Sequence, residues 1–231
     1  MTNFKEQIIN NKFSLVVSLP DNRIDFARAA IDGGAQAIKL HLNLLHRASG
    51  NSFGNLDKNK EFLKELIDLA GEIPVGVVPG AQDAFITEEE LIILEEMGIG
   101  FFSSYIHHLP PFMMDSKRLT KMVAIDNSYD AALIKAIKSS PIDVLEGSII
   151  PGESYGTPLS YSDLLRYGSL ALESGKPLLI PSQKKIKPKE VKYLYDHGCK
   201  AVMIGAVVTG GDDAEKIKKA TAEFRNVIEG L

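Results

Sequence analysis

Three places in the chain show the same junction between a predicted helix and a predicted strand. They read "AAIDGGAQAIKLH" from residue 29, "LEEMGIGFFSSY" from residue 94 and "LYDHGCKAVMIG" from residue 194. In each, a helical pattern stops at glycine, which readily adopts the left-handed conformation that ends a helix. An apolar run follows that suits a strand buried on both faces. This junction is typical of a parallel α/β sheet.

The same alternation extends along the whole sequence. Apolar runs predict eight strands near Ser14–Ser18, Ala37–His41, Val75–Val78, Gly100–Ser104, Met122–Asp126, Asp143–Glu146, Pro177–Ile180 and Ala201–Ile204. Helical patterns cover roughly residues 22–32, 57–70, 87–97, 112–119, 128–138, 160–174, 188–197 and 213–228. Thr87 and Glu90 form a capping-box pattern, which predicts a helix start at that point.

Eight alternations in 231 residues favour a single closed (β/α)8 barrel, a TIM barrel, over a doubly wound sheet. Two small domains would also suit this length, but no linker or charge run divides the sequence. We therefore expect one α/β domain spanning residues 1–231.

The composition limits the classes of partner that the chain is expected to bind. The chain is 45% hydrophobic and 24% charged with a formal net charge of -4, which does not indicate a polybasic nucleic-acid surface. No apolar run approaches the roughly 20 residues that span a bilayer, and the N-terminal segment lacks the apolar core of a signal peptide. Cys199 is the only cysteine, so an intramolecular disulfide is impossible. These features predict a cytoplasmic protein that binds neither nucleic acid nor membrane.

The second predicted strand carries Lys39 and His41 two residues apart, so both side chains face the same way. In a barrel, catalytic groups lie at the carboxyl ends of the strands. Asp126 and Glu146 each directly follow an apolar run, so we expect both carboxylates near Lys39. The four residues are our candidate catalytic groups.

Each candidate also has a structural interpretation. Lys39 and Glu146 could form a buried ion pair, because uncompensated burial of a charge costs several kcal/mol. His41 could simply hydrogen-bond in the core, and Asp126 could cap the following helix through "DNS". His41, His46, Asp126 and Glu146 match no tight metal-ligand spacing, so no metal or other cofactor is expected.

The last strand leads into "AVMIGAVVTGGDDAEKI", where Gly205 allows a ligand to approach the backbone closely. Loops after strands seven and eight of many barrels bind phosphate. The segment "IPSQKKIKPKEV" after strand seven supplies Ser182 and Gln183, followed by two lysines. We predict phosphate contacts from Ser182, Gln183, Gly205 and Ala206. Alternatively, Ser182 and the two lysines are the solvated start of a helix.

This arrangement resembles the ribulose-phosphate-binding barrel superfamily, loosely in the manner of N-acetylmannosamine-6-phosphate 2-epimerases. The resemblance covers the overall layout, and its specific part is the stretch of about fifteen residues around Gly205. It implies a phosphorylated small-molecule substrate. Lys39 on strand two is not where these epimerases would place their lysine.

Two long loops, "LLHRASGNSFGNLD" after strand two and "SIIPGESYGTPLS" after strand six, are expected to close over the site or to be plain insertions. Lys39 would polarise a carbonyl or form an imine, and Glu146 would move a proton. The sequence thus favours a phosphosugar-type isomerase or epimerase. The alternatives are a Schiff-base aldolase or lyase using Lys39 and a non-catalytic phosphate-binding barrel. A homodimer is also plausible.

Overall fold

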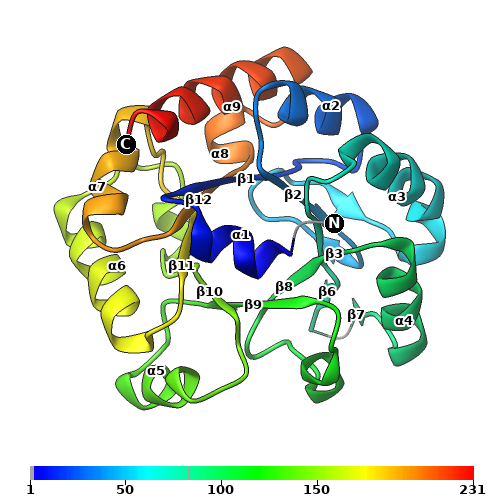
Figure 1. The fold of residues 1–231 in the computed structure, drawn as a ribbon, viewed down its shortest axis with the longest axis horizontal. Coiled ribbons are helices and arrows are strands. Elements are labelled where there is room, and N and C mark those ends of the chain that lie inside the picture. Colours follow the sequence, from blue (N-terminus) through cyan, green and yellow to red (C-terminus); the bar gives the residue numbers. More distant parts are fainter. Residues whose placement is uncertain (1–2, 83) are drawn as a thin grey trace.

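Eight parallel strands close into a barrel in the computed structural model, which describes residues 3–82 and 84–231 (Figure 1). The strands are β1 (Ser14–Ser18), β2 (Ala37–His41), β5 (Val75–Val78), β8 (Phe101–Tyr105), β9 (Thr120–Ile125), β10 (Val144–Gly147), β11 (Leu178–Pro181) and β12 (Ala201–Ile204). Around the barrel their order is β1-β12-β11-β10-β9-β8-β5-β2, with β1 pairing with both β12 and β2. The predicted (β/α)8 fold is confirmed, and every predicted strand lies within two residues of an observed one.

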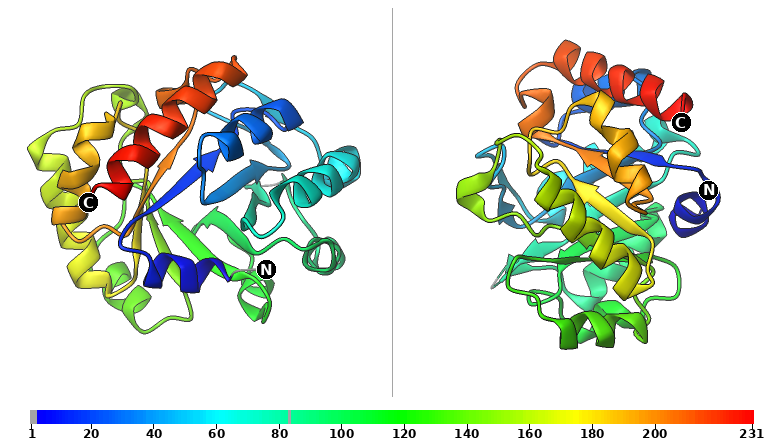
Figure 2. Two further views of the ribbon diagram at one scale, coloured as in Figure 1. Left: turned by 45° about the horizontal axis from the view of Figure 1, so that its top comes forward. Right: turned by 90° about the vertical axis from the view of Figure 1, so that its left-hand side faces the viewer.

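Helices form an outer ring around these strands (Figures 1 and 2). They are α2 (Ile24–Asp32), α3 (Leu56–Ala70), α4 (Glu88–Met97), α5 (Ala131–Lys138), α6 (Tyr161–Ser174), α7 (Val191–Asp196) and α9 (Ala214–Glu229). Shorter elements fill the connections: η1 (Pro111–Asp115), η2 (Gly152–Ser154), η3 (Pro188–Glu190), α8 (Ala206–Thr209), and two hairpins, β3 (Leu44–Leu45) with β4 (Ser52–Phe53) and β6 (Gly80–Ala81) with β7 (Ala84–Phe85).

The glycine junctions have the geometry that the sequence predicts. Gly34, Gly98 and Gly198 have φ values of 90°, 101° and 83°, which side chains with a Cβ rarely adopt. Both hydrogen bonds of the capping box between Thr87 and Glu90 are present at the start of α4. These local signals therefore place the helix ends correctly.

Several predicted helices are shorter than expected. The proline-interrupted pattern near residues 112–119 forms only the single 3-10 turn η1. Helix α5 starts at Ala131, not at residue 128, because the side chain of Asp130 caps the backbone N–H of Leu133. The pattern over 188–197 begins as η3 before it becomes α7.

A helix that the sequence did not reveal, α1 (Phe4–Asn10), closes one end of the barrel. Its Phe4 and Ile8 side chains are fully buried, and the Phe4 ring stacks on Phe101 with a centroid distance of 3.9 Å. Figure 1 views the barrel from this end, and in Figure 2 the hairpin β3–β4 lies at the opposite end. Among the described residues, the cavity open to ligands therefore lies at the opposite end.

An apolar layer fills the barrel above α1. Its members come from seven of the strands and from α1 itself: Phe4, Ile8, Val16, Ala37, Phe101, Met122, Val144, Leu179, Ala201 and Met203. The ring of Phe101 occupies the space where a side chain at Gly76 would stand, since a Cβ there would lie 2.2 Å from it. A second and larger apolar cluster fills the space between the barrel and the outer helices.

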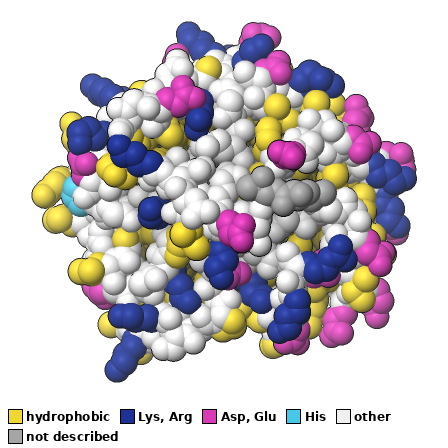
Figure 3. Space-filling view, in the orientation of Figure 1, with side chains coloured by type: hydrophobic (Ala, Val, Ile, Leu, Met, Phe, Trp, Pro, Cys, Tyr) yellow, Lys and Arg dark blue, Asp and Glu magenta, His cyan; other side chains and the backbone are white. Residues whose placement is uncertain are grey.

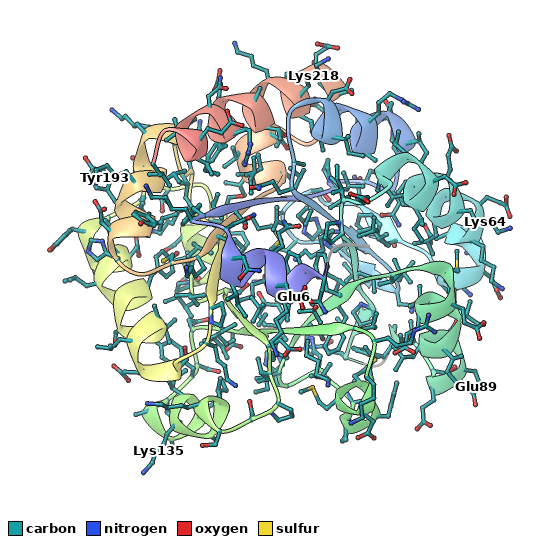
Figure 4. The ribbon with its side chains drawn as sticks, in the orientation of Figure 1. Glu6, Lys64, Glu89, Lys135, Tyr193 and Lys218 are labelled. Carbon is teal, nitrogen blue, oxygen red and sulfur yellow. The ribbon has the colours of Figure 1, made fainter. Side chains whose placement is uncertain are left out.

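Charged side chains are spread over the face of the molecule that α1 covers. On the face that α1 covers, side chains of both charges are interspersed with small hydrophobic areas (Figure 3). Lys64, Glu89, Lys135 and Lys218 point outward from the ring of helices (Figure 4). Within the described residues, no helix combines the length and the apolarity that crossing a membrane requires.

Candidate active site

A cavity of about 560 Å³ opens at the end of the barrel opposite α1. All eight strands or the residues directly after them contribute to its walls. The cavity is lined by every residue that the sequence singled out: Lys39, His41, Asp126, Glu146, Ser182, Gln183, Gly205 and Ala206. The structure thus brings the predicted catalytic and phosphate-binding residues together, while their roles stay predictions.

Lys39 and Glu146 form an ion pair at the bottom of this cavity. The Lys39 Nζ atom lies 3.5 Å from Glu146 Oε2, and the two side chains are only 7% and 6% exposed. Strands β2 and β10 occupy opposite positions in the barrel order, so this contact crosses the barrel interior. Because a buried charge needs compensation, each residue supplies the opposite charge beside the other.

Two serine hydroxyls also bind Glu146. Ser103 Oγ donates to Glu146 Oε2 at 2.6 Å, and Ser148 Oγ donates to Oε1 at 2.9 Å. Ser103 belongs to β8, and Ser148 directly follows β10. Both carboxylate oxygens are therefore held in a fixed orientation toward Lys39.

His41 lies deep in the same wall, and its Nδ1 atom has no hydrogen-bond partner among the described residues. Its ring stands 4.4 Å from the ring of His46, measured between centroids. Burial, then the neighbouring His46 and Lys39, hold the pKa of His41 well below its usual value. Burial and Lys39 likewise lower the pKa of His46 to about 4. Both imidazoles are neutral at pH 7.

Asp126 lines the cavity but is not paired with Lys39. It lies just beyond the end of β9, where its Oδ1 accepts hydrogen bonds from the Ser128 backbone N–H and hydroxyl at 2.9 and 2.6 Å. Its other oxygen lies 3.7 Å from His107 Nδ1. Asp126 thus lines the same cavity as Lys39, as expected, but among the described residues Glu146 alone is within ion-pair distance of Lys39.

Ser182 and Gly205 meet at the junction between β12 and the short helix α8. The Gly205 backbone N–H donates to Ser182 Oγ at 3.0 Å, which leaves the serine proton available to another acceptor. Ala206 begins α8, so its backbone N–H has no partner within that helix. A Cβ at Gly205 would meet only Ser18 atoms at 3.5 Å, which is ordinary contact, so packing within the chain does not require glycine here.

Gln183 uses its side chain to hold the loop after β10. Its Nε2 donates to the Ser148 carbonyl at 3.1 Å and to Tyr155 Oη at 2.6 Å, while its Oε1 accepts from the Ile150 N–H at 3.1 Å. The amide is therefore already occupied by the protein. The structure supports a positioning role for the Gln183 side chain better than the predicted phosphate contact.

Tyr105 is a further cavity residue that sequence reasoning missed. Burial raises the pKa of its hydroxyl, and the nearby Tyr155 and Glu146 raise it further. The phenol is thus a neutral hydrogen-bond donor on the wall next to Glu146. The sequence signal was its position, since Tyr105 directly follows the run "FFSS" at a strand end.

Comparison with known proteins shows the fold and not the family. No protein-family model matches the chain, and the comparison with curated protein sequences finds no match. Thiamine phosphate pyrophosphorylase from Pyrococcus furiosus superposes with a TM-score of 0.66 at 16% identity, covering 96% of this chain and 98% of that chain. A native KDPGal structure gives a TM-score of 0.64 at 16% identity, covering 96% and 97%. Tryptophan synthase of Mycobacterium tuberculosis gives 0.67 at 12% identity, covering 97% and 96%.

These similarities establish a (β/α)8 barrel over nearly the whole chain. At such low identity they do not transfer an activity, because one fold supports many chemistries. Nor do they single out the predicted resemblance to N-acetylmannosamine-6-phosphate 2-epimerases. Among the described residues, no group of three or more His, Cys, Asp or Glu side chains is arranged to hold a metal ion.

Proposed function

We propose that the protein is an enzyme that moves a proton next to the carbonyl group of a phosphorylated small molecule, as a phosphosugar-type isomerase or epimerase does. The observation that carries this proposal is the buried pair of Lys39 and Glu146 at the bottom of the open cavity. A substrate carbonyl placed beside Lys39 Nζ would be polarised by the ammonium group. The Glu146 carboxylate would then remove the neighbouring C–H proton and return it on the product side.

The surroundings of the pair support this chemistry. Ser103 and Ser148 hold the carboxylate oxygens, so Glu146 reaches one defined position in the cavity. His41 adds a neutral imidazole near Lys39, and it therefore does not compete with the ammonium group for the carboxylate. The Tyr105 hydroxyl adds a donor suited to a substrate that carries several oxygens.

The phosphate would lie at the start of α8. Ser182 Oγ and the backbone N–H of Ala206 provide donors there, and Gly205 leaves space above the backbone. The comparison with thiamine phosphate pyrophosphorylase, whose name includes a phosphorylated compound, is consistent with this choice.

A Schiff-base aldolase or lyase is the second candidate. It is favoured by the same contact, because Glu146 lies close enough to Lys39 Nζ to accept its proton and free the amine for attack on a carbonyl. In that reaction the amine forms a carbon–nitrogen bond, water leaves, and the resulting iminium withdraws electrons from the bond that breaks.

Two measurements separate these candidates. Phosphorylated ketoses, aldoses and amino sugars are incubated with the protein in deuterium oxide, and exchange of the proton next to the carbonyl is followed by NMR. The isomerase predicts exchange that Glu146→Gln abolishes. Borohydride trapping followed by mass spectrometry tests the lyase, which predicts a reduced adduct on Lys39. Saturable binding with neither exchange nor adduct would indicate the non-catalytic barrel.

A further inference from the structure

The positively charged side chains that line the main cavity differ in whether a carboxylate lies beside them. Among the described residues, the lysine and arginine side chains in its walls are Lys39 and Arg47. Lys39 is paired with Glu146, whereas Arg47 has no carboxylate within 4.0 Å in the part of the chain that the structure describes. An unmatched guanidinium at a cavity mouth favours an anionic ligand.

The two lysines after β11 do not supply this charge. Neither Lys184 nor Lys185 is among the residues that line the cavity. The Lys184 side chain instead lies 3.7 Å from Asp163 and donates to Thr157 Oγ1 at 2.8 Å. Among the described residues that line the cavity, a cation for the proposed phosphate position at α8 must therefore come from another loop.

The loop of the hairpin β3–β4, which carries Arg47, lies beside this position. The hairpin is held by a backbone hydrogen bond from His46 N–H to the Asn51 carbonyl at 2.8 Å, and by Asn51 Nδ2 donating to the Pro20 carbonyl at 2.9 Å. Ala48 and Ala206 both line the main cavity and also a neighbouring cavity of about 350 Å³. The hairpin thus stands beside the first residue of α8.

The Arg47 side chain lies against the loop after β10. Its Nη1 atom lies 2.9 Å from the point where a Cβ of Gly152 would be, in the loop after β10. Arg47 therefore joins the hairpin after β2 to the loop after β10. The missing side chain at Gly152 provides the space for the guanidinium.

We propose that Arg47 binds the phosphate group of the substrate and completes the site formed by Ser182, Gly205 and Ala206. A guanidinium presents paired N–H donors that match two phosphate oxygens, while its charge offsets the dianion. Arg47 therefore selects phosphate monoesters over the corresponding neutral sugars. This assignment rests on the proposed function for the place of the phosphate and adds the residue that recognises it.

Binding of inorganic phosphate at constant ionic strength tests the assignment directly. The backbone amide signals of Ala206 and Val207 are followed by NMR during the titration. Arg47→Gln is expected to raise the phosphate Kd by on the order of 10-fold to 100-fold. Arg47→Lys, which keeps the charge but not the paired donors, is expected to lie between this variant and wild type. Arg166→Gln removes an equal charge from the exposed face of α6 and is expected to leave the Kd unchanged.

Gly152→Val provides an independent test that keeps Arg47. The added side chain occupies the place of the guanidinium, so phosphate binding is expected to weaken several-fold when Arg47 is present. In the Arg47→Gln background the same change is expected to have no effect. Equal losses in both backgrounds would show that Gly152→Val acts without Arg47 and would count against the assignment.

Two further results would overturn the inference: equal phosphate Kd values for wild type and Arg47→Gln, or no saturable phosphate binding by wild type. Because binding is measured without turnover, the proposed function fails separately. If the protein binds phosphate through Arg47 but exchanges no substrate proton and forms no adduct, the role of Arg47 in phosphate binding is supported. The proposed catalytic function is then contradicted.

Discussion

Lys39 Nζ and Glu146 Oε2 lie 3.5 Å apart although their strands stand on opposite sides of the barrel. The pair joins the two walls of the cavity below its opening. The two residues differ in the number of their partners. Glu146 contacts Ser103 and Ser148 in addition to Lys39, whereas Lys39 has no second side-chain partner among the described residues. Replacing Lys39 and replacing Glu146 should therefore differ in their effects on stability and on activity.

Lys39→Met is expected to lower stability and to abolish turnover. It leaves a buried carboxylate supported by two hydroxyls, and breaking a buried pair in this way costs about 3–5 kcal/mol when no other group compensates. Ser103 and Ser148 should hold the loss to the lower end of that range. Urea unfolding of the wild type, Lys39→Met, Glu146→Gln and the double variant measures the coupling between the two residues.

The double variant is expected to be more stable than the sum of the single losses predicts, yet still inactive. Stability losses that simply add would show that the two side chains do not interact. If Lys39→Met loses stability but keeps an activity detected in the wild type, the role of Lys39 is purely structural.

Ser103→Ala should lower the free energy of unfolding more than Ser104→Ala does. The Ser103 hydroxyl donates to a buried carboxylate, and hydrogen bonds to charged groups contribute about 1.5–3 kcal/mol. Ser104 is equally buried on the same strand, but its hydroxyl makes only a 3.4 Å contact with the Tyr105 carbonyl. Chemical unfolding of both variants compares them, and equal losses would argue that Glu146 does not depend on Ser103.

Acid should destabilise the fold through His46. Burial and Lys39 hold its folded-state pKa at about 4, below the value of 6.5 for an unperturbed histidine. Between these two values the unfolded chain binds a proton that the folded chain does not, so the free energy of unfolding rises with pH across this window. The contribution is complete above pH 6.5 and is lost as the pH falls toward 4. His41, whose pKa is also lowered, acts in the same direction.

The difference between wild type and His46→Asn isolates this effect from the titration of carboxylates. Urea midpoints measured from pH 4.5 to 7.5 should depend less steeply on pH in His46→Asn. His197→Gln, a change on the outer surface beyond α7, is the control and should follow wild type. A slope for His46→Asn that matches wild type would contradict the predicted origin of the acid sensitivity.

Gly76→Ala should strain the apolar layer of the barrel. The new Cβ would lie 2.2 Å from the Phe101 ring, which is itself fixed by Phe4, so overpacking should cost about 1–3 kcal/mol or more. Gly100→Ala is the matched control, because its Cβ would find no atom nearer than 3.7 Å. Thermal unfolding compares the two variants, and the prediction fails if both have the same unfolding midpoint.

The sequence predicted the barrel well because its local signals agree. Glycine at each junction and an apolar run after it locate strand ends to within about two residues, and parallel strands must then bring those ends to one rim. The alternation of side chains along a strand likewise predicted that Lys39 and His41 face the same way. Their common position on the cavity wall follows from that alternation.

Other features depend on contacts that a sequence does not reveal. Ser103 and Ser104 were indistinguishable because a strand buried on both faces has no polar alternation. Asp126 lies one residue beyond β9, and that single residue lets it pair with Ser128 in place of Lys39. Gln183 is held by a loop more than 25 residues away along the chain, at Tyr155. Helix α1 is short and mostly polar, and only its contact with Phe101 shows why it forms.

The pairing of β1 with β12 has a consequence for synthesis of the chain on the ribosome. One edge of β1 has its partner in β2, which follows soon after, but the other edge has no partner until β12 has been made. During most of translation the nascent barrel therefore exposes an open strand edge, and such edges readily pair with other chains. Release of the C-terminal strand closes this edge, so a nascent chain that stalls before Ala201 would remain prone to aggregation.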